Sequence, residues 1–340
     1  MMTSTTPPAE LIEVSARIGE DIDLVQGAGG NSSVKVGEVL WVKASGTWLA
    51  AAREQPIFLP LDLGVIHRGV AAGADDPIAP ALLGGAPAGG LRPSIETSLH
   101  ALLPHRLVLH VHSVNLIAWA VRADGYAELD RRLAGLNWAW VPYVRPGLPL
   151  TRALAAILRD GRPDVLVLQN HGLVVGADDA AAAATLLAEV ERRVAVTPRP
   201  TPPVDPTWLR RRRPPGYRLP RDETCHAIAT DPESLRMAAG GSLYPDHVVF
   251  LGAHATLIDA DGAADYRGAG DGPPWLLVRG SGVLLHETLP AGGEEMVRCL
   301  ARVLPRIDPA ARLVYLSPAQ VSELLDWDAE KYRRQLAVGG

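Results

Sequence analysis

The chain has 340 residues, of which 47% are hydrophobic and 21% are charged, and its formal net charge is −5. This balance is typical of a soluble globular protein and argues against a disordered or fibrous chain. Because a single core stops growing well before this length, we expect two domains. The small negative charge gives no general attraction to nucleic acid or to an anionic membrane, so we expect neither as a partner.

The sequence predicts a cytoplasmic protein without disulfides. No run approaches about 18 consecutive apolar residues, the length that crosses a bilayer. The first residues, MMTSTTPPAE, lack the basic start and apolar core of a signal peptide. The two cysteines, Cys225 and Cys299, are far apart and have no metal-type spacing, so we expect buried thiols.

Helical and extended patterns alternate from Ala9 to Val194, which predicts an α/β domain. In chain order we expect a helix at Ala9–Asp23, strands at Ser33–Val36 and Val39–Val42, a helix at Ile95–Leu103 capped by Ser94, a strand at Leu107–His112, a helix at Asn115–Ala123, strands at Val165–Leu168 and Leu173–Val175, and a helix at Asp178–Val194. A loop rich in glycine and proline separates the first two groups of elements, at about Gly69–Pro93.

Two turns in this region offer groups that can cradle an anion. The glycine-rich turn Gly27–Asn31 ends in an amide, and the turn Lys43–Gly46 (KASG) adds an ammonium and the hydroxyl of Ser45 to its backbone N–H groups. Neither turn has the spacing of a Walker loop or of a dinucleotide fingerprint. The turns therefore support neither ATP nor NAD as a ligand.

A proline-rich stretch, residues 197–221, is expected to link two domains, at 1–196 and 222–340. Its sequence, TPRPTPPVDPTWLRRRRPPGYRLPR, holds too many prolines for us to expect a regular element. The run Arg210–Arg213 within it is expected to be solvated, and a polyanion site is the alternative.

The C-terminal part starts the mixed pattern again. We expect strands at Val248–Leu251, Ala255–Ile258, Trp275–Val278 and Val283–Leu285, followed by a helix at Gly293–Val303. Without a gap, VLVLQNHGLVV from Val165 aligns with WLLVRGSGVLL from Trp275, and His171 falls on Ser281. Two explanations stay open: a degenerate internal repeat, or the general likeness of any strand, turn, strand and helix.

Three histidines form the strongest chemical pattern. His110 and His112 lie two residues apart on an expected strand, so both imidazoles point to one face. His171 sits in an expected turn beside Gly172, which permits a close approach of the backbone. A lone histidine is more often structural, but three neutral imidazoles are a usual catalytic zinc set. The pattern therefore predicts a divalent-metal site.

Glu96 lies at the start of the helix that precedes the histidine strand, so its carboxylate can reach the end of that strand. It is expected either to bind the metal when substrate is absent or to act as a general base. The alternative is an acid in a first helical turn, favoured by the helix dipole. His100, one turn further along, is expected to support the site.

Taken in order, the motifs GAGGNSSVKV, KASG, PSIETSLH, LVLHVHS and LQNHGLVVGA resemble the class II aldolase/adducin family over about residues 10–195. The resemblance implies an α/β/α domain around a mainly antiparallel sheet. It also implies a homotetramer with active sites at subunit interfaces, and zinc or a similar ion held by His110, His112 and His171.

The same resemblance implies a metal-dependent aldolase-type lyase that acts on a small sugar or sugar phosphate through a metal-stabilised enediolate, with Glu96 as the base. The phosphate pocket of the family's sugar-phosphate aldolases matches Asn31, Ser45, Gly46 and Ser94. Hydroxyl residues of that pocket are replaced here by Ala28 and Ile95, which puts a phosphorylated substrate in question. Lys43 could compensate or suit a carboxylate. Tyr126 is the nearest match to the family's catalytic tyrosine.

The C-terminal motifs YPDHVVFLG and LLDWDAEKYRRQL resemble extended members similar to the aldolase portion of bifunctional aldolase/dehydrogenase proteins. The dehydrogenase portion and nicotinamide motifs are missing, so no NAD is expected. The alternatives that remain are an epimerase, decarboxylase or dehydratase of the family, a non-catalytic adducin-like module, and a protein that binds metal and ligand without turnover.

Overall fold

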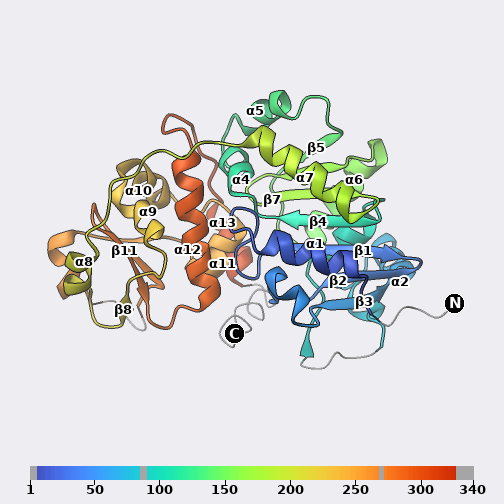
Figure 1. Ribbon diagram of the computed structural model, residues 1–340, viewed down its shortest axis with the longest axis horizontal. Coiled ribbons are helices and arrows are strands. Elements are labelled where there is room, and N and C mark those ends of the chain that lie inside the picture. Colours follow the sequence, from blue (N-terminus) through green and yellow to red (C-terminus); the bar gives the residue numbers. More distant parts are fainter. Residues whose placement is uncertain (1–5, 85–89, 268–271, 327–340) are drawn as a thin grey trace. The chain divides into compact units, whose positions relative to one another are not determined.

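The computed structural model describes residues 6–84, 90–267 and 272–326 (Figure 1). The chain divides into two compact units: Met1–Leu116 with Ala127–Val194, and Ile117–Tyr126 with Ala195–Gly340. Part of the expected Gly69–Pro93 loop, and the motif LLDWDAEKYRRQL beyond Asp326, lie outside the described residues.

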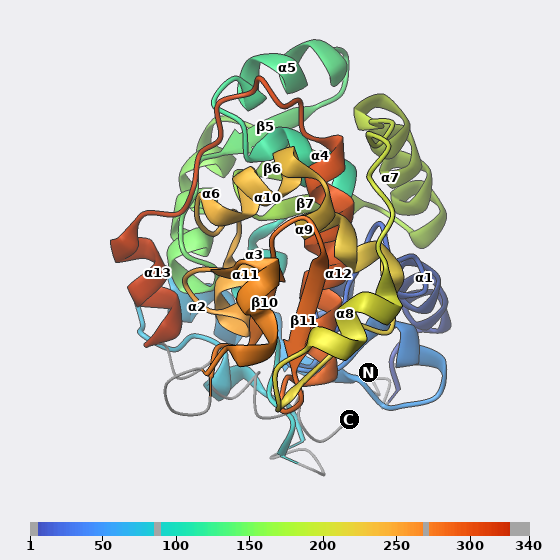
Figure 2. The same ribbon diagram turned by 90° about the vertical axis from the view of Figure 1, so that its left-hand side faces the viewer.

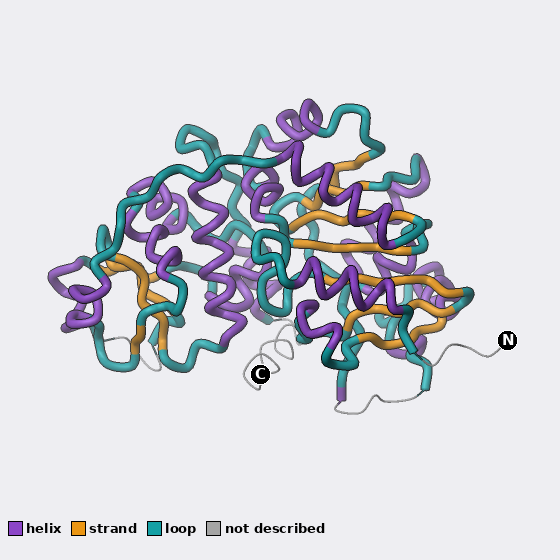
Figure 3. The backbone as a smooth tube through the Cα atoms, viewed as in Figure 1, coloured by secondary structure: helices purple, strands orange, loops and turns teal. Residues whose placement is uncertain are grey.

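The first unit is built on a seven-stranded sheet in the order β3-β2-β1-β4-β7-β6-β5, drawn in orange in Figure 3. Its strands are β1 (Asn31–Val36), β2 (Val39–Lys43), β3 (Phe58–Asp62), β4 (Leu107–Val111), β5 (Trp138–Val141), β6 (Val165–Leu168) and β7 (Gly172–Ala177). Neighbouring strands run antiparallel except β5 and β6, which are parallel. The expected mainly antiparallel sheet is confirmed.

Helices cover both faces of this sheet, which confirms the α/β/α layering (Figure 2). One face carries α1 (Ala9–Gly19) and α7 (Ala180–Val194), and the other carries α2 (Leu63–Ala71), α3 (Thr97–Leu102) and α6 (Leu148–Asp160). The apolar stripe of α1, with Leu11, Val14 and Ile18, is buried, as its helical spacing predicts. The short helices α4 (Val114–Ala120) and α5 (Gly125–Arg132) follow β4.

A shared apolar core fixes α3 against the middle of the sheet. Leu99 of α3 and Leu103, which follows the helix, pack in one cluster with Val108 of β4 and Leu166 of β6. Burying leucine-sized side chains in such a core contributes about 1.5 to 3 kcal/mol each. The start of α3, where Glu96 precedes the helix, is therefore held close to β4.

The second unit has a smaller four-stranded sheet in the order β8-β11-β10-β9. Its elements are α8 (Pro206–Arg212), β8 (Tyr217–Arg218), α9 (Ala227–Thr230), α10 (Pro232–Ala239), α11 (Pro245–Leu251), β9 (Thr256–Ile258), β10 (Trp275–Val278), β11 (Gly282–His286), α12 (Ala291–Val303) and α13 (Pro318–Leu325). The expected smaller C-terminal α/β part is confirmed.

Two expectations for the C-terminal part are wrong. Val248–Leu251 is not a strand but the end of α11, which Pro245 opens at a position where proline suits a helix. All seven residues of α11 are buried, so no helical period marks its sequence. The stretch 197–221 does contain regular elements, α8 and β8, and the carboxylate of Asp205 caps α8.

The four arginines Arg210–Arg213 are exposed, as expected. The assignment of residues 197–221 as a linker between independent domains stays a prediction.

The second sheet repeats the topology of half of the first. The order β8-β11-β10-β9 follows β4-β7-β6-β5, with antiparallel, antiparallel and parallel pairing in both. The register also agrees, because Val165 pairs with Val175 and Trp275 pairs with Leu285. The likeness therefore extends beyond one hairpin, which supports the degenerate repeat.

The repeat does not retain the histidines. Ser281 aligns with His171. Arg218 pairs with Leu285 as Leu109 pairs with Val175, so Leu219 and Arg221 follow where the first unit has its histidine pair.

None of the helices in the described ranges has the length and apolar character needed to cross a bilayer.

We predict that burial of His247 makes the second unit less stable in acid. Burial lowers the pKa of His247 to about 4, from an ordinary value of 6.5. The unfolded chain then binds the proton more readily, so stability falls as the pH drops through this window. From about pH 6.5 to about pH 5 we expect a loss of about 1.5 kcal/mol from this residue.

Urea unfolding of the His247→Phe variant checks this, because phenylalanine keeps a ring but cannot titrate. Its stability should fall less over the same pH range than that of the wild type. His254→Phe, at an exposed position, is the matched control and should keep the full loss. An equal loss in the wild type and His247→Phe would contradict the prediction.

Candidate metal centre

The three histidines predicted from the sequence converge in the first unit. One ring nitrogen from each of His110, His112 and His171 lies within 4.8 Å of the others, and all three side chains are buried. The Nε2 atoms of His110 and His112 are 3.2 Å apart. Two nitrogens bound to one tetrahedral zinc ion lie about 3.3 Å apart, given Zn–N bonds of about 2.0 to 2.1 Å. The donor set therefore fits a divalent metal.

Pairing between β4 and β7 brings the histidines together. In this antiparallel pair His110 lies opposite Val174, and Val111 lies opposite Leu173. The turn before β7 carries His171, so it lies beside the end of β4. His110 Nδ1 lies 3.0 Å from the carbonyl oxygen of Leu173. As Nδ1–H donates to this oxygen, the lone pair on Nε2 is available for a metal.

The turn that presents His171 depends on its two neighbours. Asn170 has a φ of 54°, a left-handed conformation that asparagine tolerates better than most residues. Gly172 lies so close to β4 that a Cβ atom there would be 2.5 Å from the carbonyl oxygen of Val111. The same atom would lie 3.2 Å from the ring of His112. The histidine cluster therefore requires glycine at position 172.

Glu96 lies at the edge of the histidine cluster and is buried. Its Oε2 is 3.3 Å from Nε2 of His110, and its Oε1 is 3.7 Å from Nε2 of His171. Burial raises the pKa of this carboxyl, but the charges of the two histidines and a hydrogen bond from Asn31 outweigh that effect and lower the pKa to about 2. Glu96 is therefore an anion at neutral pH.

Asn31 contacts Glu96 directly, which the sequence did not predict. Its Nδ2 donates to Oε2 of Glu96 at 2.8 Å and to Oγ of Ser94 at 3.2 Å. Asn31 begins β1 opposite His110, and the preceding Gly30 approaches the His110 carbonyl with a φ of +60°. The end of the glycine-rich turn is thereby fixed against the histidine strand. The contact joins residues 65 positions apart, and no local pattern reveals it.

Lys43 connects the two turns predicted to cradle an anion. Its ammonium donates to the carbonyl oxygens of Ala28 at 2.9 Å and of Thr47 at 2.7 Å, and the side chain is buried. The main chain at Ser45 is anchored too, because the Ser45 N–H donates to the carbonyl of Arg92. Lys43 holds both turns in place.

The remaining predicted residues divide into two groups. Ser45, Gly46 and Ser94 lie in the turns that Lys43 and Asn31 hold, and Ser45 and Ser94 are buried. Tyr126 is different: it belongs to the second unit and is 55% exposed. Its catalytic role stays a prediction.

His100 supports α3 rather than joining the cluster. Its Nδ1 lies 2.7 Å from Oγ of Ser33 on β1, and burial lowers the pKa of its imidazole to about 3. A neutral His100 thus ties the helix that follows Glu96 to the strand that follows Asn31.

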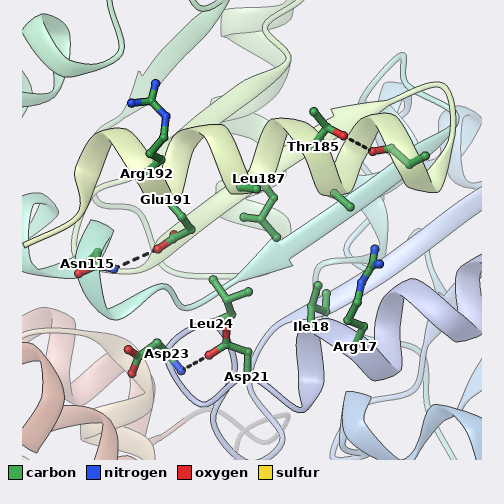
Figure 4. Close-up of a pocket in the computed structure, with 13 residues that line it drawn as sticks. Arg17, Ile18, Asp21, Asp23, Leu24, Asn115, Thr185, Leu187, Glu191 and Arg192 are labelled. Atoms are coloured by element: carbon green, nitrogen blue, oxygen red, sulfur yellow. Dashed lines mark hydrogen bonds between the residues drawn. The ribbon is translucent and has the colours of Figure 1, made fainter.

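A groove with a volume of about 1010 Å³ lies on the other face of the sheet, between α1 and α7 (Figure 4). Leu24, Leu187 and alanines of α7 line it, and Asn115 donates to Glu191 at one end. The groove is not lined by the histidines or by Glu96. The convergence of the imidazoles, not the size of this groove, identifies the centre.

An α/β/α domain with a buried three-histidine centre is thus the class of protein that the fold and the site define. A model of the class II aldolase and adducin N-terminal domain matches residues 9–197, which is more than half of the chain. The chain belongs to the class II aldolase/adducin family.

Individual relatives show the same likeness. A Bacillus subtilis (strain 168) protein named uncharacterized oxidoreductase YuxG is 32% identical over 180 residues, which are 48% of this chain and 26% of that protein. The chain thus spans about a quarter of that relative's length.

Among solved structures, the N-terminal class II aldolase domain of a conserved protein from Thermoplasma acidophilum is 26% identical, with a TM-score of 0.48. The match covers 57% of this chain and 94% of that one. An L-fuculose-1-phosphate aldolase from Thermus thermophilus is 19% identical with a TM-score of 0.36, covering 55% of this chain and 92% of that one.

We predict that Gly172→Ala disrupts the centre without removing a ligand. The added Cβ would collide with the Val111 carbonyl, so β4 and the turn must move apart. Such overpacking costs about 1 to 3 kcal/mol, and metal affinity should fall at least about tenfold, the low end of effects on supporting residues. Thermal unfolding and zinc titration measure the two effects.

Gly161→Ala is the matched control for this substitution. Nothing lies within 4 Å of a Cβ added at Gly161, so stability and zinc affinity should stay near those of the wild type. Wild-type zinc affinity in Gly172→Ala would show that the close approach of the turn to β4 is not required.

Proposed function

We propose that the protein is a metal-dependent aldolase-type lyase that acts on a small hydroxylated carbonyl compound. The observation that carries this proposal is the convergence of His110, His112 and His171 beside the buried carboxyl group of Glu96. Zinc is the ion we propose, since three neutral imidazoles are a usual catalytic zinc set. When bound, the ion supplies a Lewis acid that polarises the carbonyl of the substrate.

Glu96 is the base in this proposal. Asn31 holds Oε2, whereas Oε1 is buried and has no hydrogen-bond partner. We therefore assign to Oε1 the removal or return of a proton at the carbon next to the substrate carbonyl. The amide of Asn31 fixes the plane of the carboxylate, so a single oxygen faces the reacting atoms.

Retention of all three imidazoles favours an enzyme over an adducin-like binding module, which would lack the ligands. Epimerases, decarboxylases and dehydratases are the alternatives within the family, because each can use a base beside a polarised carbonyl. We also propose that the protein forms the homo-oligomer that the family resemblance implies. Sedimentation equilibrium measures the number of chains in the assembly.

Two substitutions separate metal binding from proton transfer. His112→Ala should lose both zinc and turnover, because one of three ligands is removed. Glu96→Gln should keep about one zinc ion per chain and lose about 10²- to 10⁴-fold in turnover, the usual contribution of a general base. The measurements are metal analysis of the purified protein and a screen of aldol and retro-aldol substrates, with products identified to detect epimers or loss of carbon dioxide.

His254→Ala, an exposed histidine of the second unit, is the control and should behave as the wild type. Full activity in both His112→Ala and Glu96→Gln would exclude the proposed function. A zinc-loaded protein that turns over none of the substrates would leave metal binding without catalysis, which was the third alternative from the sequence.

A further inference from the structure

The second unit keeps the backbone of the turn that carries His171 in the first unit. At the start of its turn, the N–H of Arg279 donates at 3.0 Å to the carbonyl of Ile258, the last residue of the parallel strand β9. The corresponding N–H in the first unit donates to the last residue of β5 at 2.9 Å. The next residue is left-handed in both turns, with a φ of 67° at Gly280 and 54° at Asn170. The two turns therefore share these backbone features and differ in their side chains.

The first side chain of the turn is used differently in the two units. In the first unit, Oε1 of Gln169 accepts from the backbone N–H of Tyr143 at 3.2 Å, so this amide stabilises the fold. Arg279 aligns with Gln169, and its Nε donates to Oδ1 of Asp259 at 3.2 Å. Among the described residues, no hydrogen bond involves either Nη atom of Arg279. These nitrogens can therefore donate to a ligand.

A groove with a volume of about 380 Å³ lies beside this turn of the second unit. Arg279 and Gly280 of the turn line it, and so does Arg236 of α10. The hydroxyl of Thr230, which is also in the lining, donates to the carbonyl of Pro202. The other lining residues are apolar: Ala229, Pro232, Leu235, Ala239 and Leu257. Sites for small organic ligands commonly have a volume in this range and a mainly apolar lining.

The charged side chains in this lining are both positive. Arg236 donates from Nε and Nη2 to Glu233 at 2.9 and 2.8 Å, and no hydrogen bond within the described ranges involves its Nη1. Glu233 and Asp259, the acidic partners of the two arginines, do not line the groove. A guanidinium group stays protonated at any ordinary pH, and its planar fork of N–H groups suits a carboxylate. The lining therefore offers positive charge for an anion and apolar surface for the rest of the ligand.

The backbone around the groove favours a carboxylate over a phosphate. Phosphate sites usually add backbone N–H groups from a turn or from the start of a helix. Here the N–H of Gly280 donates to the carbonyl of Ala229 at 2.9 Å. The start of α10 is capped by the carboxylate of Asp231, which accepts from the N–H of Ser234. Guanidinium groups without such backbone donors match the smaller charge and planar shape of a carboxylate.

We propose that this groove binds a small carboxylate with an apolar body. Arg236 and Arg279 donate to its carboxylate, and Leu235 and Leu257 pack against its body. The groove lies wholly within the second unit and includes no residue of the histidine cluster, so the inference does not rest on the proposed function. The second unit thus lacks the aligned histidines and contributes a binding site for an organic anion.

Matched probes test the site on the zinc-loaded full chain by calorimetric titration. Hexanoate has the proposed carboxylate and an apolar body, hexanol lacks the charge, and acetate lacks the body. We expect hexanoate to bind at least about tenfold more tightly than either, because each comparison removes one kind of contact. Hexanol or acetate binding as tightly as hexanoate would overturn the proposal. Tighter binding of hexyl phosphate, or no binding of hexanoate, would overturn it as well.

Arg279→Met and Arg236→Met test the two guanidinium groups. Each should weaken hexanoate binding about tenfold, because methionine keeps an apolar stem and removes the charge. The two side chains are 57% and 54% exposed, so the fold should tolerate both changes. Arg210→Met, at an exposed arginine of α8 that does not line the groove, is the control and should leave the affinity unchanged.

A carboxylate can also bind a metal ion, so the histidine cluster needs its own control. His112→Ala, which removes one of the proposed zinc ligands, should bind hexanoate as tightly as the wild type does. Loss of hexanoate binding in His112→Ala would place the probe at the metal, and wild-type affinity in both methionine variants would place it away from the groove. Either result would overturn the proposal and leave the proposed function of the first unit intact.

Discussion

The antiparallel pairing of β4 with β7 is the constraint on which the rest of the site depends. It sets the end of the His110 strand beside the turn that carries His171, and the alternation of a strand puts His112 on the same face. A shift of the register by one residue would turn both strand histidines to the opposite face. The close contact of Gly172 with Val111 holds the register at the point where the histidines meet.

Contacts around the histidine cluster determine the protonation state of Glu96. Burial alone would favour a neutral carboxyl at Glu96, yet two imidazoles and the Asn31 amide reverse that preference. Asn31 is itself carried by β1, the neighbour of β4 on the other side from β7. Four adjacent strands, β2-β1-β4-β7, thus hold the histidine cluster, the partner of the Glu96 carboxylate and the lysine that supports the turns. Because the centre rests on a sheet, its geometry depends little on long loops.

Sequence patterns predicted the convergence of the three histidines well because strand alternation is local. They predicted less of what surrounds them. β3 contains Pro60, which weakens its strand pattern, and β5 is a short edge strand, so neither was predicted. Neither were α2 and α6. In the second unit, the fully buried helix α11 gave an apolar run that was mistaken for a strand. The contact of Asn31 with Glu96 could not be predicted, because it depends on how distant strands and loops pack.

The second unit repeats this topology without the aligned histidines. It repeats the strand order and register of β4-β7-β6-β5 with Ser281 in place of the turn histidine. The X-ray absorption spectrum of the zinc-loaded protein tests most directly whether the three histidines bind the metal. We expect a shell of light atoms at about 2.0 to 2.1 Å, with scattering from about three imidazole rings. A shell made only of oxygen atoms, without imidazole scattering, would contradict it.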